Sequence, residues 1–183
     1  HNCLVGSEMC IRDRSNSGHV RVYENNNGTW TQIGSDIDGE SSYDYSGYSE
    51  SGSAVSLSGD GSVVAIGAYA NDGGGNASGH VRIYENNNGT WTQIGSDIDG
   101  EAAGDSLGYS VSISPDGTTV AVGAVFNDDN GSNSGHVRIY ENNNGTWTKI
   151  GGDIDGEASN DFSGFSVSLS SDGSVVAIGA AYN

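Results

Sequence analysis

Basic residues are scarce in this chain of 183 residues, which contains 6 Lys and Arg against 24 Asp and Glu. The formal net charge of −18 repels phosphate backbones and anionic membrane surfaces, so nucleic acid is not expected as a partner. Long apolar runs are also missing, because the longest are short stretches such as residues 63–66, whereas a membrane-spanning helix needs roughly 20 apolar residues. We therefore expect no membrane insertion.

Proline occurs once among 30 glycines, a composition that disfavours a helical bundle. Cysteine occurs only as Cys3 and Cys10, within residues 1–14, a segment that matches no other part of the chain. The run from Leu4 to Asp13 resembles the translation of a transposase adapter used in sequencing libraries, so residues 1–14 are predicted to be a non-native leader. The two cysteines therefore support no inference about disulfides, metal sites or the redox compartment of the protein.

Most of the chain is a tandem repeat. A motif that begins Ser-Gly-His-Val-Arg and ends Asn-Gly-Thr-Trp-Thr starts at Ser17, Ser78 and Ser134, at intervals of 61 and 56 residues. A second motif lies between the copies and is clearest at residues 108–124. The repeats divide residues 15–183 into units near 17–77, 78–133 and 134–183.

The first interval contains five extra residues, which we place in the stretch from Ser46 to Ser51. With this placement Gly52 opens a strand in which Val55 and Leu57 keep the alternation of apolar and polar residues. Insertions are also better tolerated in a loop than in a strand.

Four strands are predicted in each unit, at about 109–114, 119–124, 80–85 and 90–94 in the clearest copies. The unbroken Val-Ala-Val run in the second of these strands indicates burial on both faces. A four-residue loop over residues 86–89 would join the last two strands and place Tyr84 opposite Trp91 and Glu85 opposite Thr90.

Both faces of this predicted hairpin carry large side chains. One face holds His80, Arg82, Tyr84, Trp91 and Gln93, and the other holds Val81, Ile83 and Ile94. An antiparallel sheet that recurs along the chain and carries large side chains on both faces buries them best when it stacks on copies of itself around an axis. The sequence therefore predicts an all-β fold, a fragment of a β-propeller with about three blades of four antiparallel strands.

The succession of Gly-Tyr-Ser-Val, Asp-Gly, an aliphatic strand, Gly-Ala, a polar loop and Gly-His-Val-Arg-Ile-Tyr resembles the FG-GAP repeat of integrin-α-type propellers, over residues 15–183. The resemblance implies a propeller fold and, in the family, a calcium loop of the form Asp-x-Asn-x-Asp-Gly between the first two strands. This chain has a single carboxylate in each such loop, at 58–61, 114–117 and 170–173, which is too few for the 6–8 oxygens that calcium takes. The calcium site of the family is therefore not expected here.

A partial ring of blades leaves unpaired edges and an open flank. We therefore predict that the chain is an internal fragment of a longer protein and needs further blades of the same chain.

The acidic motif formed by Asp97, Asp99 and Glu101, repeated at 36–40 and 153–157, contains the candidate metal ligands. Alternate residues of an extended chain point to one side, so the three carboxylates would lie together and a calcium ion could neutralise them. The alternative, which we favour, is a solvated acidic connection between blades. No cofactor is expected on this interpretation, with calcium as the alternative.

Two other residue types recur once per repeat. His19, His80 and His136 are interpreted as packing or hydrogen-bonding positions, because equivalent histidines on three blades lie too far apart to share a metal ion. Trp30, Trp91 and Trp147 are expected to pack against a cross-strand Tyr, with exposed sugar-binding platforms as the alternative.

The chain contains no recognisable catalytic constellation. We predict a non-catalytic binding or adhesion scaffold of a secreted or cell-surface protein, whose blade loops present a surface to a protein or glycan partner. The alternative is the propeller portion of an extracellular hydrolase or lyase with catalytic residues outside this segment. The acidic surface suits an extracellular medium, where salt screens the repulsion between charges.

Overall fold

The computed structural model describes residues 15–49 and 54–183. All secondary-structure elements assigned within these ranges are β-strands; no helix is assigned there. None of these residues belongs to a helix long and apolar enough to cross a membrane. The predicted leader, residues 1–14, lies outside the described residues, as do residues 50–53.

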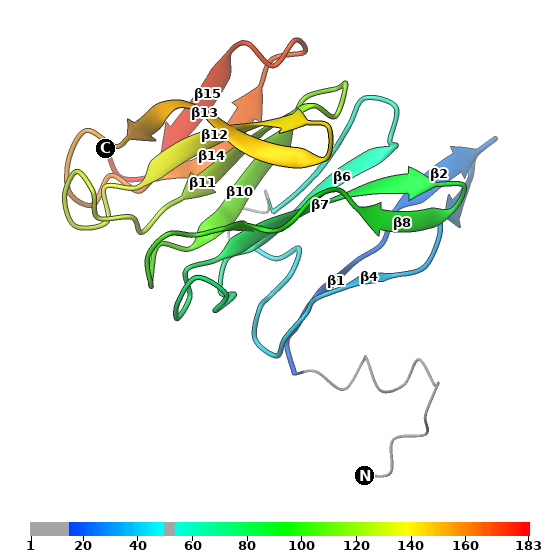
Figure 1. Cartoon of the computed structure of the whole chain (residues 1–183), viewed down its shortest axis with the longest axis horizontal. Helices are drawn as coiled ribbons and strands as arrows, with labels where there is room; N and C mark the ends of the chain where they lie inside the picture. Colours follow the sequence, from blue (N-terminus) through cyan, green and yellow to red (C-terminus); the bar gives the residue numbers. More distant parts are fainter. Residues whose placement is uncertain (1–14, 50–53) are drawn as a thin grey trace.

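The strands form successive antiparallel sheets, which we call blades, and Figure 1 shows them following one another in chain order. The first blade contains β1 (His19–Val20), β2 (Tyr23–Asn26), β3 (Thr29–Gln32) and β4 (Ile37–Asp38). The second contains β5 (Val55–Leu57), β6 (Val63–Ala68), β7 (His80–Asn87), β8 (Thr90–Gln93) and β9 (Ile98–Asp99). The third contains β10 (Leu107–Ile113), β11 (Thr119–Ala124), β12 (His136–Asn143) and β13 (Thr146–Asp155), and the fourth contains β14 (Ser163–Leu169) and β15 (Val176–Ala180).

In the first blade β1 pairs with β4 and β2 pairs with β3, as two two-stranded sheets, whereas hydrogen bonding in the next two blades largely follows chain order. The third blade is paired β10-β11-β12-β13, and the second is paired β5-β6-β7-β8 with β9 also on β7. All of these strand pairs are antiparallel. The predicted all-β fold of four-stranded propeller blades is confirmed, and the strand predicted over 119–124 has the bounds of β11.

The hairpin between β7 and β8 differs from the prediction, because its loop has two residues instead of four. Asn87 pairs with Thr90 and Tyr84 pairs with Gln93, so the predicted pairs of Tyr84 with Trp91 and of Glu85 with Thr90 are wrong. Asn88 and Gly89 have φ values of 52° and 87°, as a type I′ turn requires. The register moves by two residues, so each side chain stays on the face predicted for it.

We expect the Gly89→Ala variant to unfold with a free energy about 1 kcal/mol smaller than that of the parent chain, because an L-residue is strained at this positive φ. A Cβ at Gly89 would have no atom within 4 Å, so the loss would come from the backbone alone. Gly152→Ala is the matched control, because a Cβ there is equally free and φ is not in the left-handed region. Urea denaturation measures both, and equal stability of the two variants would contradict the turn assignment.

The apolar cores lie between blades. One cluster joins Ala65, Val81 and Ile83 of the second blade to Val120 and Val122 of the third, among other residues. A second cluster joins the first blade to the second through Val20, Ile37, Val64, Ile66 and Tyr84. Val64, Ala65 and Ile66 on β6 are all buried, which confirms that this strand is covered on both faces.

Backbone segments of neighbouring blades approach closely where β11 meets β14. A Cβ on Gly123 would lie 2.2 Å from the carbonyl oxygen of Gly164, so only glycine fits there. The Ser110 hydroxyl donates a hydrogen bond to the same carbonyl at 2.7 Å. The blades therefore contact one another through main-chain atoms as well as through apolar side chains.

The tryptophans also join blades. The indole N–H of Trp91 donates to the carbonyl of Ile33 at 2.9 Å, and that of Trp147 donates to the carbonyl of Ile94 at 3.0 Å. Both side chains pack on the core clusters that contain Tyr84 and Tyr140. The expectation of packing therefore holds for these two residues, although the cross-strand partner of Trp91 is Asn86. Trp30 has the same sequence context but is 66% exposed.

Replacing Trp147 by Phe should reduce the free energy of unfolding by about 1–2 kcal/mol, because the carbonyl of Ile94 loses its donor and the smaller ring leaves apolar surface uncovered. Trp30→Phe is the control and should change stability by less than about 0.5 kcal/mol, since its indole is mostly exposed. Thermal unfolding followed by circular dichroism compares the two variants. Equal destabilisation would show that Trp147 does not couple the blades.

The parallel bridges align the first interval with the second. Gly18 pairs with Ser46 as Gly79 pairs with Leu107, so Gly47 corresponds to Gly108. The strand that contains Val55 and Leu57 is β5, which begins at Val55. Gly52, which was predicted to open this strand, lies outside the described residues, so its role and the site of the extra residues stay predictions.

Candidate functional site

The acidic motif of Asp97, Asp99 and Glu101 is divided between two blade interfaces. Asp97 lies with Glu40 and His80, while Glu101 lies with Asp129, His136 and Asp153; in each group the possible ligand atoms are within 4.8 Å of one another. Among the described residues Asp99 belongs to neither group. The N–H of Gly100 bonds to the carbonyl of Gly79 at 2.8 Å, and Glu101 follows beyond the paired end of β9. The three carboxylates are therefore not brought together as an alternating strand would bring them.

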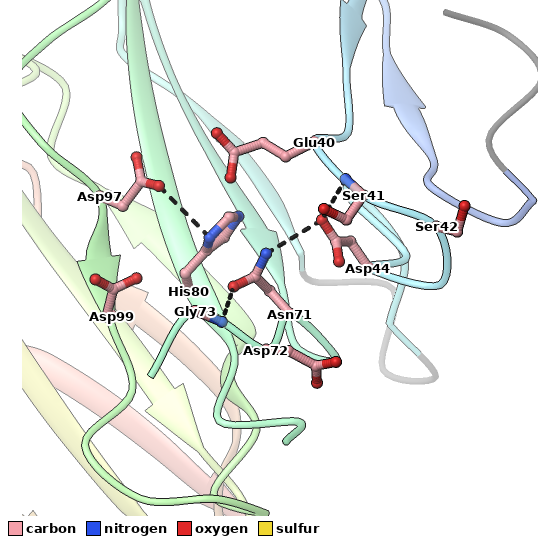
Figure 2. Close-up of a pocket in the computed structure, with 10 residues that line it drawn as sticks. All are labelled: Glu40, Ser41, Ser42, Asp44, Asn71, Asp72, Gly73, His80, Asp97 and Asp99. Carbon is pink, nitrogen blue, oxygen red and sulfur yellow. Dashed lines mark hydrogen bonds and ion pairs between the residues drawn. The ribbon is translucent and has the colours of Figure 1, made fainter. Parts of the chain in front are cut away.

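The first group lies in a pocket of about 360 Å³ between the first and second blades. Figure 2 shows the carboxylates of Glu40 and Asp97 beside the imidazole of His80, with Asn71 and Asp44 on its other side. The complete lining is Glu40, Ser41, Ser42, Asp44, Asn71, Asp72, Gly73, His80, Asp97 and Asp99. Acidic side chains thus dominate a pocket with a histidine in its wall.

His80 is 1% exposed and opens β7. Its Nδ1 is 3.7 Å from Oδ2 of Asp97, too far for a hydrogen bond, and its Nε2 has no hydrogen-bond partner among the described residues. Burial lowers the pKa of His80, and the nearby Arg82 guanidinium lowers it further, so the neutral imidazole is favoured. The expectation of a packing position is consistent with this burial, but the expected hydrogen bonds are not made.

The second group lies between the second and third blades and contains two cations of the chain itself. Arg138 donates to Oδ1 and Oδ2 of Asp153 at 3.0 and 2.8 Å and also contacts Glu101. Lys149 donates to Asp153 at 2.5 Å. The hydrogen bond from Arg138 holds the pKa of Asp153 well below its usual range. These carboxylates are therefore neutralised from within the protein.

The equivalent arginine behaves differently in the second blade. Arg82 lies 3.2 Å from Glu40 and donates to the backbone carbonyl of Asp38 at 3.0 Å. Asp97 instead accepts a 2.6 Å hydrogen bond from the neutral amide of Gln93, which occupies the position of Lys149. The carboxylate of Asp97 therefore lacks the two cationic partners that Asp153 has.

The single carboxylate of each Asp-Gly loop stabilises its turn. Asp60 accepts hydrogen bonds from the Ser58 hydroxyl and from both the N–H and the hydroxyl of Ser62, at 2.7–2.9 Å. Asp172 does the same with Ser170 and Ser174. These bonds, led by that from the Ser62 hydroxyl for Asp60 and by that from the Ser170 hydroxyl for Asp172, lower the pKa of each carboxyl to about 2.

These two carboxylates should contribute stability that is fully present above about pH 4, their unfolded pKa, and is lost as the pH falls towards 2. In the Ser62→Ala variant the pKa of Asp60 should rise towards its ordinary value, because two of its hydrogen bonds come from Ser62 and one of them is removed. Carboxyl carbon chemical shifts followed over pH measure this, with Asp172 in the same sample as the reference. An unchanged midpoint for Asp60 would contradict the assignment.

Buried Asp and Asn pairs form a feature that the sequence interpretation missed. Asn127 donates to Asp105 at 3.1 Å, and Asn71 donates to Asp44 at the same distance. Burial raises the pKa of Asp105. Asn127 thereby joins the loop that follows β11 to the turn that precedes β10.

A comparison of the three equivalent histidines with one another does not reveal the two groups of histidine and carboxylates. Each group instead combines the histidine of one blade with the glutamate of the preceding blade. The sequence does contain a signal, since every acidic motif ends in Glu and two of the three are followed by a repeat that opens with His. Only the stacking of blades shows that these two positions meet.

Comparison with known proteins supports the blade assignment. The sequence model of the FG-GAP repeat matches residues 97–140, which extend from the end of the second blade through β10 and β11 into β12. No curated protein matches the chain. FG-GAP repeats occur typically in extracellular or cell-surface proteins, suggest propeller-type domains that often serve adhesion or binding, and are generally non-catalytic. Residues 97–140 therefore match the FG-GAP repeat and lie within the stacked, propeller-like blades of the structure.

Proposed function

We propose that the chain is a non-catalytic binding or adhesion scaffold of a secreted or cell-surface protein, which presents one edge of its blades to a protein or glycan partner. The observation that carries this proposal is a continuous series of aromatic rings across successive blades. We call this series the aromatic row; it consists of Tyr45, Tyr48, Tyr69, Tyr109, Phe126, Phe162, Phe165 and Tyr182.

Each ring in the aromatic row contacts at least one other, with centroids 5.3–6.4 Å apart. Tyr109 lies in β10 and Phe165 in β14, and the other rings come from the turns before β5 and β14 and from the residues that follow β6, β11 and β15. The ring contacts therefore connect successive blades in one series, in which Tyr109 is buried.

Part of the aromatic row is exposed. Tyr48 is 51% exposed, Phe126 39% and Tyr182 76%. Tyr45, Tyr48 and Tyr69 also line a pocket of about 460 Å³ together with Asn16 and Gly18. Exposed aromatic rings beside polar groups are typical of binding surfaces, because a ring offers a large contact area with little loss of side-chain entropy on binding.

Trp91 and Trp147 are less suited to this role than the tyrosines, because they pack on the core clusters and donate their indole N–H groups to neighbouring blades. Trp30 is 66% exposed, so the alternative of a sugar-binding platform stays open for this residue. The acidic composition supports an extracellular location, where salt screens the net charge of −18.

Binding of the full chain to arrayed glycans and immobilised extracellular matrix proteins tests the proposal. We expect the Tyr48→Ala variant to bind at least about tenfold more weakly, which corresponds to about 1.4 kcal/mol. Tyr23→Ala is the control, because Tyr23 is 45% exposed on β2 and lies outside the aromatic row. Binding equally reduced in both variants, absence of any binding, or cleavage of a bound glycan would each refute the proposed function.

A further inference from the structure

The pocket between the first and second blades concentrates negative charge around one buried imidazole. Five carboxylates line it, from Glu40, Asp44, Asp72, Asp97 and Asp99. Arg82 is the cation that pairs with this group, and it contacts Glu40 rather than Asp97. This excess of negative charge favours the binding of an external cation.

His80 supplies an observation independent of the acidic side chains. It is 99% buried and lines the pocket, and its Nδ1 faces Asp97 at 3.7 Å, too far for a hydrogen bond. Its Nε2 also has no hydrogen-bond partner among the described residues, so neither ring nitrogen is satisfied by the protein part that the structure describes. A buried polar group without a partner is costly, and metal coordination is one way in which a buried imidazole is satisfied. Figure 2 shows the ring lying against the carboxylates of Asp97 and Glu40.

The equivalent group at the next interface explains why only one of the two would take an ion. There, Arg138 and Lys149 both bond to Asp153, and Arg138 also contacts Glu101. In the first pocket the position of Lys149 is occupied by Gln93, which is neutral. The third blade thus carries a cation, Lys149, at the position where the second blade has the neutral Gln93.

We propose that the pocket between the first and second blades binds one divalent transition-metal ion of the zinc type through His80, Asp97 and Glu40. A nitrogen and two carboxylate oxygens form a donor set that suits zinc better than calcium, which takes only oxygen ligands. The site differs from the Asp-Gly loops, whose carboxylates are occupied by Ser hydroxyls. It does not depend on the proposed binding function.

The geometry needs only small side-chain movements. Zinc binds nitrogen and oxygen ligands at about 2.0–2.2 Å, so tetrahedral ligand atoms lie roughly 3.4 Å apart. Nδ1 of His80 and Oδ2 of Asp97 are already 3.7 Å apart. The side chain of Glu40 is 45% exposed and would have to exchange its 3.2 Å contact with Arg82 for the ion, and water would complete the coordination. Burial lowers the pKa of His80, which keeps the imidazole in the neutral form that a metal requires.

Titration of the full chain with zinc chloride, followed by isothermal calorimetry, tests the site. Cys3, Cys10 and His1 should be replaced by Ser, Ser and Ala in every sample, because thiolates and imidazoles bind zinc themselves. We expect one zinc ion per chain. Zinc affinity should fall at least about tenfold in Asp97→Asn and in His80→Gln, with Asp97→Asn as the safer variant because its side chain is 27% exposed.

Three controls separate coordination from general acidity and stability. Asp99→Asn removes a charge from the same pocket, and His136→Gln and Asp153→Asn alter the equivalent group, so all three should keep the zinc affinity within about threefold. Zinc should also shift the ring nitrogen resonances of His80 and not those of His136. Zinc binding unchanged by Asp97→Asn, an equal loss in Asp99→Asn, or calcium bound more tightly than zinc would overturn the proposal.

Discussion

The stacking of each blade on the next is the constraint on which the rest of this structure depends. A single sheet with Val64, Ala65 and Ile66 in its centre has apolar atoms on both faces, and only another sheet covers them. Gly123 allows the backbones to approach, and the Trp147 indole bonds across the gap. Stability, the aromatic row and both histidine groups all follow from this contact between neighbouring repeats.

Nearly identical repeats still produce interfaces with different chemistry. Arg138 on β12 bonds to Asp153 in the third blade, whereas the equivalent Arg82 on β7 contacts Glu40 and the Asp38 carbonyl. One substitution, Lys149 in place of Gln93, places a further cation at only one interface. The metal site that we propose therefore depends on a difference between the copies rather than on what the copies share.

Much of the fold was predictable because its signals are local. The alternation of Val and Ser predicted the strand that is β10, and the Val-Ala-Val run predicted β11 with its full bounds. Because both patterns recur along the chain, they also predicted that the sheets stack on one another. The hairpin loop was predicted too long, since Asn86 and Asn87 have turn-forming side chains but remain paired in the strand. The faces were still assigned correctly, because a shift of two residues preserves the alternation of side chains.

The sequence by itself determined which residue types recur, which faces are apolar, and that each Asp-Gly loop contains a single carboxylate. Only the tertiary structure decided which carboxylates meet. Asp97 and Glu101 are four residues apart, yet they lie with different histidines, because Glu101 follows the paired end of β9 and contacts the next blade. Contacts between repeats depend on how the blades stack in space, and spacing along one strand carries no information about that arrangement.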